Sequence, residues 1–298
     1  MSVLKNKIDF ALVFTVRNAN PNGDPIDGNR PRTTYEGFGE VSDVCLKRKI
    51  RNRLIDEGQP IFVQSDDRRA EGDNFRSLND RANGNAALAA CRKEMEKNSK
   101  TKEDFIQIAC NAWFDVRAFG QVFAFKSKKK GDDGEGADAV SIGIRGPVSI
   151  QPAFSLRPVN ITSTQITKSV NLETGADPDK KGNDTMGMKH RVDFGVYVTY
   201  GSINVQTSSK TGFDDDDAEI LKNALQTLFR NDATSARPDG SMEVVKVIWW
   251  KHSCPNGNLS SAKVHRSLNV ALEDNGEIRE ITVGALPAEI ETQVLDGE

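Results

Sequence analysis

The chain has 298 residues with 37% hydrophobic and 28% charged side chains, and its 40 basic and 43 acidic residues give a formal net charge of −3. These values exclude membrane-spanning helices and argue against wholesale disorder, while the length suffices for one large domain or two modest ones. The chain begins without a long apolar segment of the secretory kind, and its four cysteines form no Cys-x-x-Cys pair, so we expect a soluble cytoplasmic protein with reduced thiols.

Positive charge is unevenly distributed along the chain. Between residues 29 and 53, seven basic residues stand against three acidic ones, whereas acidic residues gather at 214–217 and from residue 273 onward. Binding to a polyanion needs a local positive surface and does not need a positive total. The small negative net charge therefore does not exclude a nucleic-acid ligand.

Large apolar side chains occupy every second position of residues 8–17, which predicts a strand with one buried face. The segment Asn-Ala-Asn-Pro-Asn-Gly-Asp-Pro at 18–25 follows, and regular structure must stop there because proline and glycine interrupt it. The expected buried face holds Ile8, Phe10, Leu12, Phe14 and Val16, and the opposite face holds Asp9, Thr15 and Arg17.

A helix is predicted at 41–57, where Leu46, Ile50 and Leu54 form one apolar stripe. Cations flank this stripe as i, i+4 pairs, which repel each other by roughly 0.2–0.5 kcal/mol in a helix. Such pairs are more favourable beside phosphates, which offset the repulsion, than beside water. Composition alone gives equal weight to a basic face that is simply solvated. The pairs are Lys49 with Arg53 and Lys47 with Arg51.

The middle of the chain predicts an insertion followed by strands. We expect a short strand at 60–64 and then a helical insertion with helices at 86–97 and 102–116. Residues 128–136 contain no apolar side chain and predict a mobile loop. Segments 139–159 and 192–205 are rich in strand-forming residues, and the polar stretch 162–189 between them predicts a long hairpin arm.

A helix at 214–230 and a strand at 243–251 complete the expected elements. The four aspartates at 214–217 fall in the first turn of the helix, where its dipole favours negative charge, so capping explains them better than a metal cluster does. The resulting order, strand–helix–strand–strand–helix–strand, is that of ferredoxin-like folds and RNA-recognition domains, and we predict an α+β fold. Residues 193–200 carry aromatic side chains but miss the register of the RNA-recognition octamer.

The sequence contains no recognisable catalytic motif. Gly-x-Ser-x-Gly, Walker, His-Glu-x-x-His and Rossmann patterns are all absent. His252, Cys254 and His265 lack the paired spacing of structural zinc sites. Asp24 and Asp27 are the only carboxylates placed where a site could form, and aspartates in such loops more often shape turns. Nothing in these patterns requires a metal, a cofactor or an enzymatic activity, and we expect none of them, although the motifs alone leave an enzyme open.

Three segments resemble the repeat-associated (RAMP) backbone proteins of CRISPR effector complexes. They are the octet at 18–25, the segment Trp-Phe-Asp-Val-Arg-Ala-Phe-Gly at 113–120 and the glycine-bounded strand Ser-Ile-Gly-Ile-Arg-Gly-Pro-Val at 141–148. Their order is consistent over most of the chain. The resemblance is closest to the Cascade backbone subunit of subtype I-C.

This resemblance implies a helical stack of identical subunits on one CRISPR guide RNA, which is presented for pairing with a target DNA strand. Further implied partners are the large, small and guide-processing Cascade subunits, and no membrane is expected. In this family an RRM-like palm binds the guide, a helical insertion forms fingers, and a β-hairpin thumb reaches over the next subunit. The palm is assigned to 1–64, 138–159 and 191–298, the fingers to 65–137 and the thumb to 160–190.

A protein that binds guides of any sequence must recognise the backbone and the shape of the RNA, and base identity is then read by Watson–Crick pairing. We therefore expect basic and amide side chains near phosphates, with Met186 or Met188 as an apolar wedge beside a displaced base. The candidate RNA-binding residues are Arg17, Asn18, Asn20, Asn22, Arg30, Arg32, Ser42, Lys47, Lys49, Arg51, Arg53, Arg117, Arg145, Lys168, Lys189, His190 and Arg191.

Two alternative functions remain open. Backbone subunits of type III complexes are similar in fold and cut target RNA with an aspartate in the loop after the first strand, a place that Asp24 or Asp27 could take. The protein would then be a metal-dependent ribonuclease. A regulatory or developmental relative without a role in immunity is the other alternative. Similarity to the DNA-targeting subtype, and the constraint of Pro25 beside Asp24, favour a non-catalytic subunit over the ribonuclease.

Overall fold

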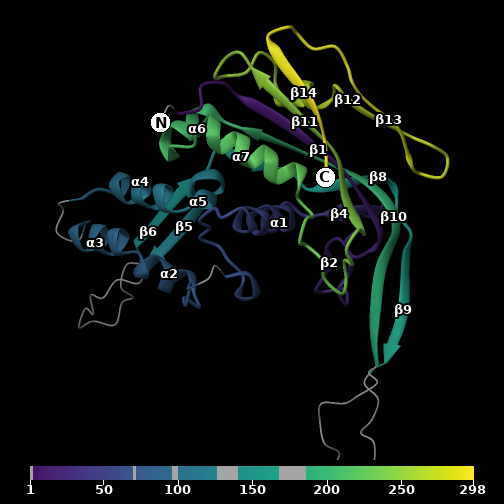
Figure 1. Cartoon of the computed structure of the whole chain (residues 1–298), viewed down its shortest axis with the longest axis horizontal. Coiled ribbons are helices and arrows are strands. Elements are labelled where there is room, and N and C mark those ends of the chain that lie inside the picture. Colours follow the sequence, from purple (N-terminus) through teal and green to yellow (C-terminus); the bar gives the residue numbers. More distant parts are fainter. Residues whose placement is uncertain (1–2, 70–71, 96–99, 126–139, 168–185) are drawn as a thin grey trace, which may run out of the picture.

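The computed structural model describes residues 3–69, 72–95, 100–125, 140–167 and 186–298. Figure 1 shows a body built on one large sheet, a helical lobe beside it and a two-stranded arm that extends away from the body. The strand pairings of the large sheet are antiparallel, and separate helices accompany them. The predicted α+β class is confirmed.

The large sheet has eight strands. Six follow one another in the order β14-β11-β1-β10-β8-β4, and β7 and β9 pair with further parts of β10. The strands are β1 (Ile8–Ala19), β4 (Phe38–Val41), β7 (Val148–Ile150), β8 (Ala153–Pro158), β9 (Ile161–Thr167), β10 (Met186–Ile203), β11 (Met242–His252) and β14 (Ile290–Asp296).

Two split strand–helix–strand units generate this order. Helix α1 (Asp43–Asp56) lies between β1 and β8 in the chain, and β10 separates those two strands in the sheet. Helix α7 (Asp215–Gln226) connects β10 to β11 in the same way, with β1 between them. This is the βαββαβ arrangement of ferredoxin-like folds that the sequence predicted.

The first strand is buried on both faces, so the prediction of a single buried face was wrong. Phe10 and Phe14 pack toward α1 and α7 in the main hydrophobic core, as expected. Ala11 and Val13 are also fully buried, because elements that the sequence did not predict cover the opposite face of the sheet. These elements are α8 (Ser261–His265), β12 (Leu268–Leu272) and β13 (Ile278–Val283).

The helical lobe has a hydrophobic core of its own. Phe123 packs against Phe62 and Phe105, with ring centroids 5.1 and 5.3 Å apart. Ile142 and Ile144 join this core, which therefore extends beyond the predicted insertion limits of 65 and 137. The elements of the lobe are α2 (Leu78–Gly84), α3 (Ala86–Met95), α4 (Lys102–Ala112), α5 (Phe114–Phe119), β5 (Gly120–Phe125) and β6 (Val140–Arg145).

Both helices predicted in the insertion are present, as α3 and α4. The second ends earlier than predicted, because Trp113 has extended backbone dihedrals (φ −138°, ψ 127°) and separates α4 from α5. Helix α4 begins at a capping box in which Thr101 and Asp104 bond each other's backbone N–H groups. The mobile loop predicted at 128–136 lies outside the described residues.

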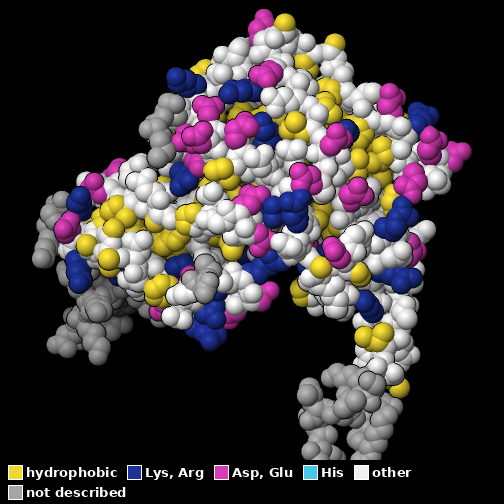
Figure 2. Space-filling view, in the orientation of Figure 1, with side chains coloured by type: hydrophobic (Ala, Val, Ile, Leu, Met, Phe, Trp, Pro, Cys, Tyr) yellow, Lys and Arg dark blue, Asp and Glu magenta, His cyan; other side chains and the backbone are white. Residues whose placement is uncertain are grey.

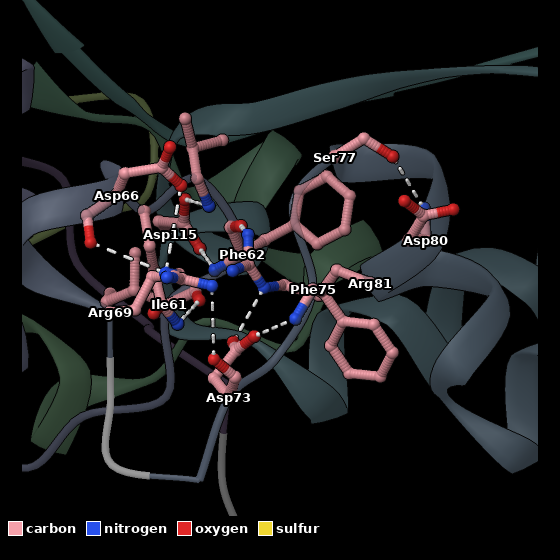
Figure 3. A network of polar contacts seen from close by, with 12 residues as sticks. Ile61, Phe62, Asp66, Arg69, Asp73, Phe75, Ser77, Asp80, Arg81 and Asp115 are labelled. Carbon is pink, nitrogen blue, oxygen red and sulfur yellow. Dashed lines mark hydrogen bonds and ion pairs between the residues drawn. The ribbon is translucent and has the colours of Figure 1, made fainter.

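Residues 60–64 do not form the predicted strand. The backbone N–H groups of Phe62 and Val63 donate to the Asp115 carboxylate, at 2.7 and 3.1 Å, and this carboxylate takes the place of a neighbouring strand (Figure 3). A short 3-10 helix, Asp66–Arg68, follows.

The predicted hairpin arm is present in the described residues. β9 pairs with the outer half of β10 from Ile161 and Val192 out to Thr167 and Met186. The inner half of β10 runs through the centre of the sheet, so the arm is a direct continuation of a core strand (Figure 1). Residues 168–185, which include the tip, lie outside the described residues.

The aspartate run caps α7, as predicted. Asp214 is the N-cap and accepts a hydrogen bond from the Asp217 backbone N–H at 2.9 Å, while the Asp217 carboxylate accepts one from the Asp214 N–H at 3.2 Å. Helix α6 (Val205–Thr211), which precedes this run, was not predicted. The described helices include none long and apolar enough to cross a membrane. All four cysteines are free thiols.

Candidate nucleic-acid interface

The loop after β1 is held by its own asparagines. The Asn20 side chain is buried and its Nδ2 donates to the Asn29 carbonyl at 2.7 Å. Asn22 Oδ1 accepts from the Ser42 hydroxyl at 2.8 Å, and Ser42 in turn caps α1 by accepting from the Cys45 N–H. These predicted donors therefore shape the loop and the start of α1, whereas Asn18 is exposed and has a left-handed backbone (φ 52°).

The two loop aspartates lie in and beside a small hairpin made by β2 (Gly23–Asp24) and β3 (Arg30–Pro31). The Asp24 carboxylate accepts a hydrogen bond from the Ile26 N–H at 3.1 Å and lies 3.4 Å from the Arg32 guanidinium. The Asp27 backbone bonds to Asp24 and Arg30. Among the described residues no cluster of three potential metal ligands occurs.

All four predicted cations of α1 have partners within the chain. Each nitrogen that was expected beside a phosphate lies beside a carboxylate, which removes the like-charge repulsion that the sequence suggested. The pairs are Lys47 with Asp43 at 3.1 Å, Lys49 with Asp232, Arg51 with Asp115 at 2.8 Å and Arg53 with Glu57 at 3.1 Å.

Arg51 belongs to a network that joins α1 to the helical lobe, and Figure 3 shows Asp115, Phe62 and Arg81 of this network. Its partner Asp115, on α5, is 1% exposed and also accepts the backbone N–H groups of Phe62 and Val63. Arg81 on α2 donates to the Phe62 carbonyl at 2.8 Å. Asp115 is thus the shared acceptor between the body and the lobe.

Arg117 and Arg17 are also paired. The Arg117 guanidinium donates to both Asp217 oxygens at 2.7 Å and is largely buried, which ties α5 to the start of α7. Arg17 remains near the surface, where it contacts Glu277 at 2.5 Å and lies 4.4 Å above the Phe194 ring.

Four of the remaining predicted cations gather with His190 where the arm meets the body, at a place that we call the arm-root surface. Lys189 is exposed and has no ion pair in the described part of the chain, and Arg191 has only a 3.9 Å contact with Asp193. Dark-blue Lys and Arg side chains follow this edge of the molecule in Figure 2. The arm-root surface consists of Arg30, Arg32, Lys189, His190 and Arg191.

The loop hairpin is docked on the arm at this surface. Arg30 Nη1 donates to the Ser163 hydroxyl at 3.4 Å, and the same hydroxyl lies 2.8 Å from His190 Nδ1. Because Arg30 comes from β3, Ser163 from β9 and His190 from β10, three strands meet there. No local sequence pattern indicates that the loop and the arm are neighbours.

Other predicted residues lie away from this cluster. Met186 and Met188, on the arm, are 66% and 54% exposed, as an apolar wedge requires. Arg145 is exposed at the end of β6 in the helical lobe. Lys168 lies outside the described residues.

The sheet face that RNA-recognition domains use for base stacking is covered in this protein. Tyr200 on β10 stacks on His265 of α8, with ring centroids 4.8 Å apart, and Trp250 is fully buried in the same layer. His252 donates to the buried Asp9 carboxylate at 2.8 Å, with Asn258 bonding its other ring nitrogen. The histidines thus anchor α8 and β11, and α8 with β12 and β13 covers the central strands of this face, while Phe154 on the outer strand β8 is 42% exposed.

Sequence reasoning missed Tyr35, which is 104% exposed in the turn between β3 and β4. The available signal was weak: a single aromatic residue within the otherwise polar segment Arg-Thr-Thr-Tyr-Glu-Gly at 32–37. A turn was predictable from Gly37, but the direction of the ring was not.

Comparisons with known proteins agree on one family. The model of the family "CRISPR-associated protein Cas7" matches residues 6–285. A curated CRISPR-associated protein Cas7 of Haloferax volcanii is 28% identical over 242 residues, which cover 77% of this chain and 66% of that relative, slightly under two thirds of its length.

The solved structures that the chain resembles are more distant in sequence. A chain of a "CRISPR RNA-guided surveillance complex, pre-nicking" has a TM-score of 0.42 at 11% identity over 82% of this chain and 78% of its own length. A chain of a "CRISPR RNA-guided surveillance complex" has a TM-score of 0.40 at 14% identity over 82% and 68%.

Proposed function

The chain belongs to the CRISPR-associated Cas7 family, and from this premise we propose that it is a non-catalytic backbone subunit that binds guide RNA in a Cascade complex. Copies of the chain would stack along one guide and leave its bases free to pair with a target DNA strand. The large, small and guide-processing subunits would complete the assembly. The assignment to subtype I-C stays a prediction from the sequence resemblance.

The observation that carries the proposal is the arm-root surface. Its Lys189 and Arg191 are exposed and weakly paired, whereas the cations of α1 are neutralised by carboxylates. A strand of nucleic acid gains most where it replaces water and salt ions at unpaired cations, since displacing an existing carboxylate cancels much of the gain. We therefore place the guide backbone at the arm root and not along α1.

The architecture suits this role. In the proposal the ferredoxin-like sheet is the palm, the lobe with its separate core forms the fingers, and the arm of β9 and β10 is the thumb. The exposed Met186 and Met188 would wedge beside a displaced base, and a protein that contacts phosphates in this way can serve any guide sequence.

The test is a salt series of RNA binding with two charge-matched double variants. Lys189→Ala with Arg191→Ala should weaken binding to every RNA sequence, and the slope of log affinity against log salt should fall by about 0.7 for each lost single-strand phosphate contact. Lys263→Ala with Arg266→Ala removes two exposed cations, one on α8 and one at its C-cap, and should change neither value. Equal effects of the two variants would contradict the proposed site.

A further inference from the structure

Tyr35 stands out among the described aromatic side chains. It is 104% exposed, whereas the next most exposed, Phe154 and Phe75, are 42% and 37% exposed. The other two tyrosines are enclosed, Tyr197 in the main core and Tyr200 against His265. A fully solvated aromatic ring leaves a large apolar area in contact with water, and such residues are enriched at binding surfaces.

The turn that carries Tyr35 is well defined by backbone hydrogen bonds. Thr34 bonds Phe38 in both directions, donating from its N–H to the Phe38 carbonyl at 2.8 Å and accepting from the Phe38 N–H through its hydroxyl at 3.2 Å. Gly37 has a left-handed backbone (φ +86°) and closes the turn by donating to the Thr34 carbonyl at 3.1 Å. The ring is therefore presented at little further conformational cost.

The turn is attached to the root of the arm. The Val159 N–H, two residues before β9, donates to the Gly37 carbonyl at 3.0 Å. The same β3–β4 segment supplies Arg30, which bonds Ser163 on the arm, and Arg32. An exposed aromatic ring thus belongs to the same docked segment as two cations of the arm-root surface.

Proteins that bind single-stranded nucleic acid without sequence preference combine these two features. Cations follow the backbone, and aromatic rings stack on the bases, which is sequence-tolerant because every base has a π-face. The sheet face that could have offered aromatic platforms is covered by α8, β12 and β13. Among the described aromatic side chains, Tyr35 alone is more than half exposed.

We propose that Tyr35 is a stacking platform for one base of a single-stranded RNA lying on the arm-root surface. The inference rests on the proposed RNA-binding function and adds a stacked base to the phosphate contacts of the arm-root surface. The ring, and not the hydroxyl, makes the contact, so phenylalanine can replace tyrosine and leucine cannot. One base stacked in this way adds affinity without selecting a sequence.

The experiment compares two probes of equal length that a single subunit can cover: an oligouridylate and an abasic ribose-phosphate oligomer. Tyr35→Ala should lower affinity for the oligouridylate roughly 5- to 100-fold, the usual value of one base–aromatic stack, and should leave affinity for the abasic probe unchanged. Tyr35→Phe should bind like the wild type and Tyr35→Leu like Tyr35→Ala. Ile26→Ala removes a 97% exposed side chain from the neighbouring β2–β3 turn and is the matched control.

Each outcome separates the stacking inference from the proposed function. If the wild type binds neither probe, the RNA-binding function fails. If it binds both and Tyr35→Ala has no effect, or an equal effect on the two probes, the stacking role is wrong. An equal loss with Ile26→Ala would indicate general apolar contact and would also overturn it. A loss confined to multi-subunit assembly on long RNA, with short-probe affinity intact, would assign Tyr35 to a contact between copies of the chain and reject stacking.

Discussion

The ammonium of Lys49 lies buried against the carboxylate of Asp232, 183 residues further along the chain. Arg237 donates to the same carboxylate at 3.1 Å, so one anion serves two cations. Burial lowers the pKa of Lys49 because it disfavours the charged form, and Asp232 counteracts this. The middle of the basic helix therefore belongs to the interior, where it joins α1 to the segment after α7.

Removing Asp232 should destabilise the protein more than removing Lys49. Asp232→Ala leaves the Lys49 charge buried without its partner, which typically costs about 3–5 kcal/mol. Lys49→Met keeps the aliphatic length, and Asp232 retains Arg237, so the loss should be smaller. Urea denaturation of both variants measures the difference, and equal losses would contradict the pairing. Lys49→Met should also keep the wild-type salt slope of RNA binding.

Asp115→Ala should loosen the helical lobe from the body. The substitution leaves Arg51 and two backbone N–H groups without their acceptor, at a cost of about 3–5 kcal/mol. Hydrogen exchange at Phe62 and Val63 should accelerate. Asp56→Ala, which removes a partly exposed pair with Arg68, is the control and should cost less than about 1 kcal/mol. Unchanged exchange in Asp115→Ala would show that the lobe is held by its apolar contacts alone.

Stability should decrease as the pH falls below about 6.5, in part through His265. Burial lowers the pKa of His265, with the Asp9 carboxylate 3.7 Å away and the Gly201 carbonyl opposing the shift and Lys7 adding to it. On acidification, His265 therefore takes up its proton at a higher pH in the unfolded chain than in the folded chain. The stability that His265 contributes is present above the unfolded pKa and is lost as the pH falls below it. His265→Gln should flatten the dependence of urea midpoints on pH between about 7 and 5.

Asp9 should contribute to the pH dependence of stability in a lower pH range than His265 does. Burial alone would raise its pKa, but hydrogen bonds from His252 and Lys7 outweigh burial and leave the pKa below its ordinary value. The His265→Gln variant should therefore still lose stability below about pH 4, where the unfolded Asp9 takes up its proton. If the urea midpoint of His265→Gln depends on pH between 7 and 5 as that of the wild type does, groups other than His265 cause the loss of stability in this range.

The carboxylates of the first loop should be structural. Asp24→Ala removes the hydrogen bond to the Ile26 N–H and should cost about 1 kcal/mol, whereas Asp27→Ala should cost less. Neither variant should change the fate of a complementary RNA incubated with the protein and Mg²⁺, because we expect no cleavage by the wild type. Divalent-dependent cutting that either substitution abolishes would support the ribonuclease alternative.

Replacing residues 163–188 with a short Gly-Ser linker should affect assembly more than folding. The described arm residues are mostly exposed and contribute little to either sheet core. The melting temperature of the isolated subunit should be nearly unchanged, while ordered multi-subunit particles on guide RNA should be lost. Particles of full size with the same periodic nuclease protection would show that this segment is not the thumb.

The elements whose signals are local were predictable from the sequence alone. Alternation over 8–17 placed β1, apolar spacing placed α1 and α7, and the aspartates at 214–217 identified the cap of α7, because each signal involves residues only a few positions apart. The prediction of a strand at 60–64 was wrong because backbone N–H groups of this segment bond to Asp115, and no local pattern reveals that contact. The elements after residue 251 have short or weakly patterned segments and were missed.

Which cations face solvent depends on long-range contacts that form when the chain folds. The sequence shows that Lys49, Arg51 and Arg117 are basic, but their carboxylates lie 183, 64 and 100 residues away. Folding brings those charges together and leaves Lys189 and Arg191 exposed and weakly paired. The candidate interface is therefore at Lys189 and Arg191 and not on α1. The exposure of Tyr35 was decided in the same way, because burial depends on what packs against a residue and not on its neighbours in the chain.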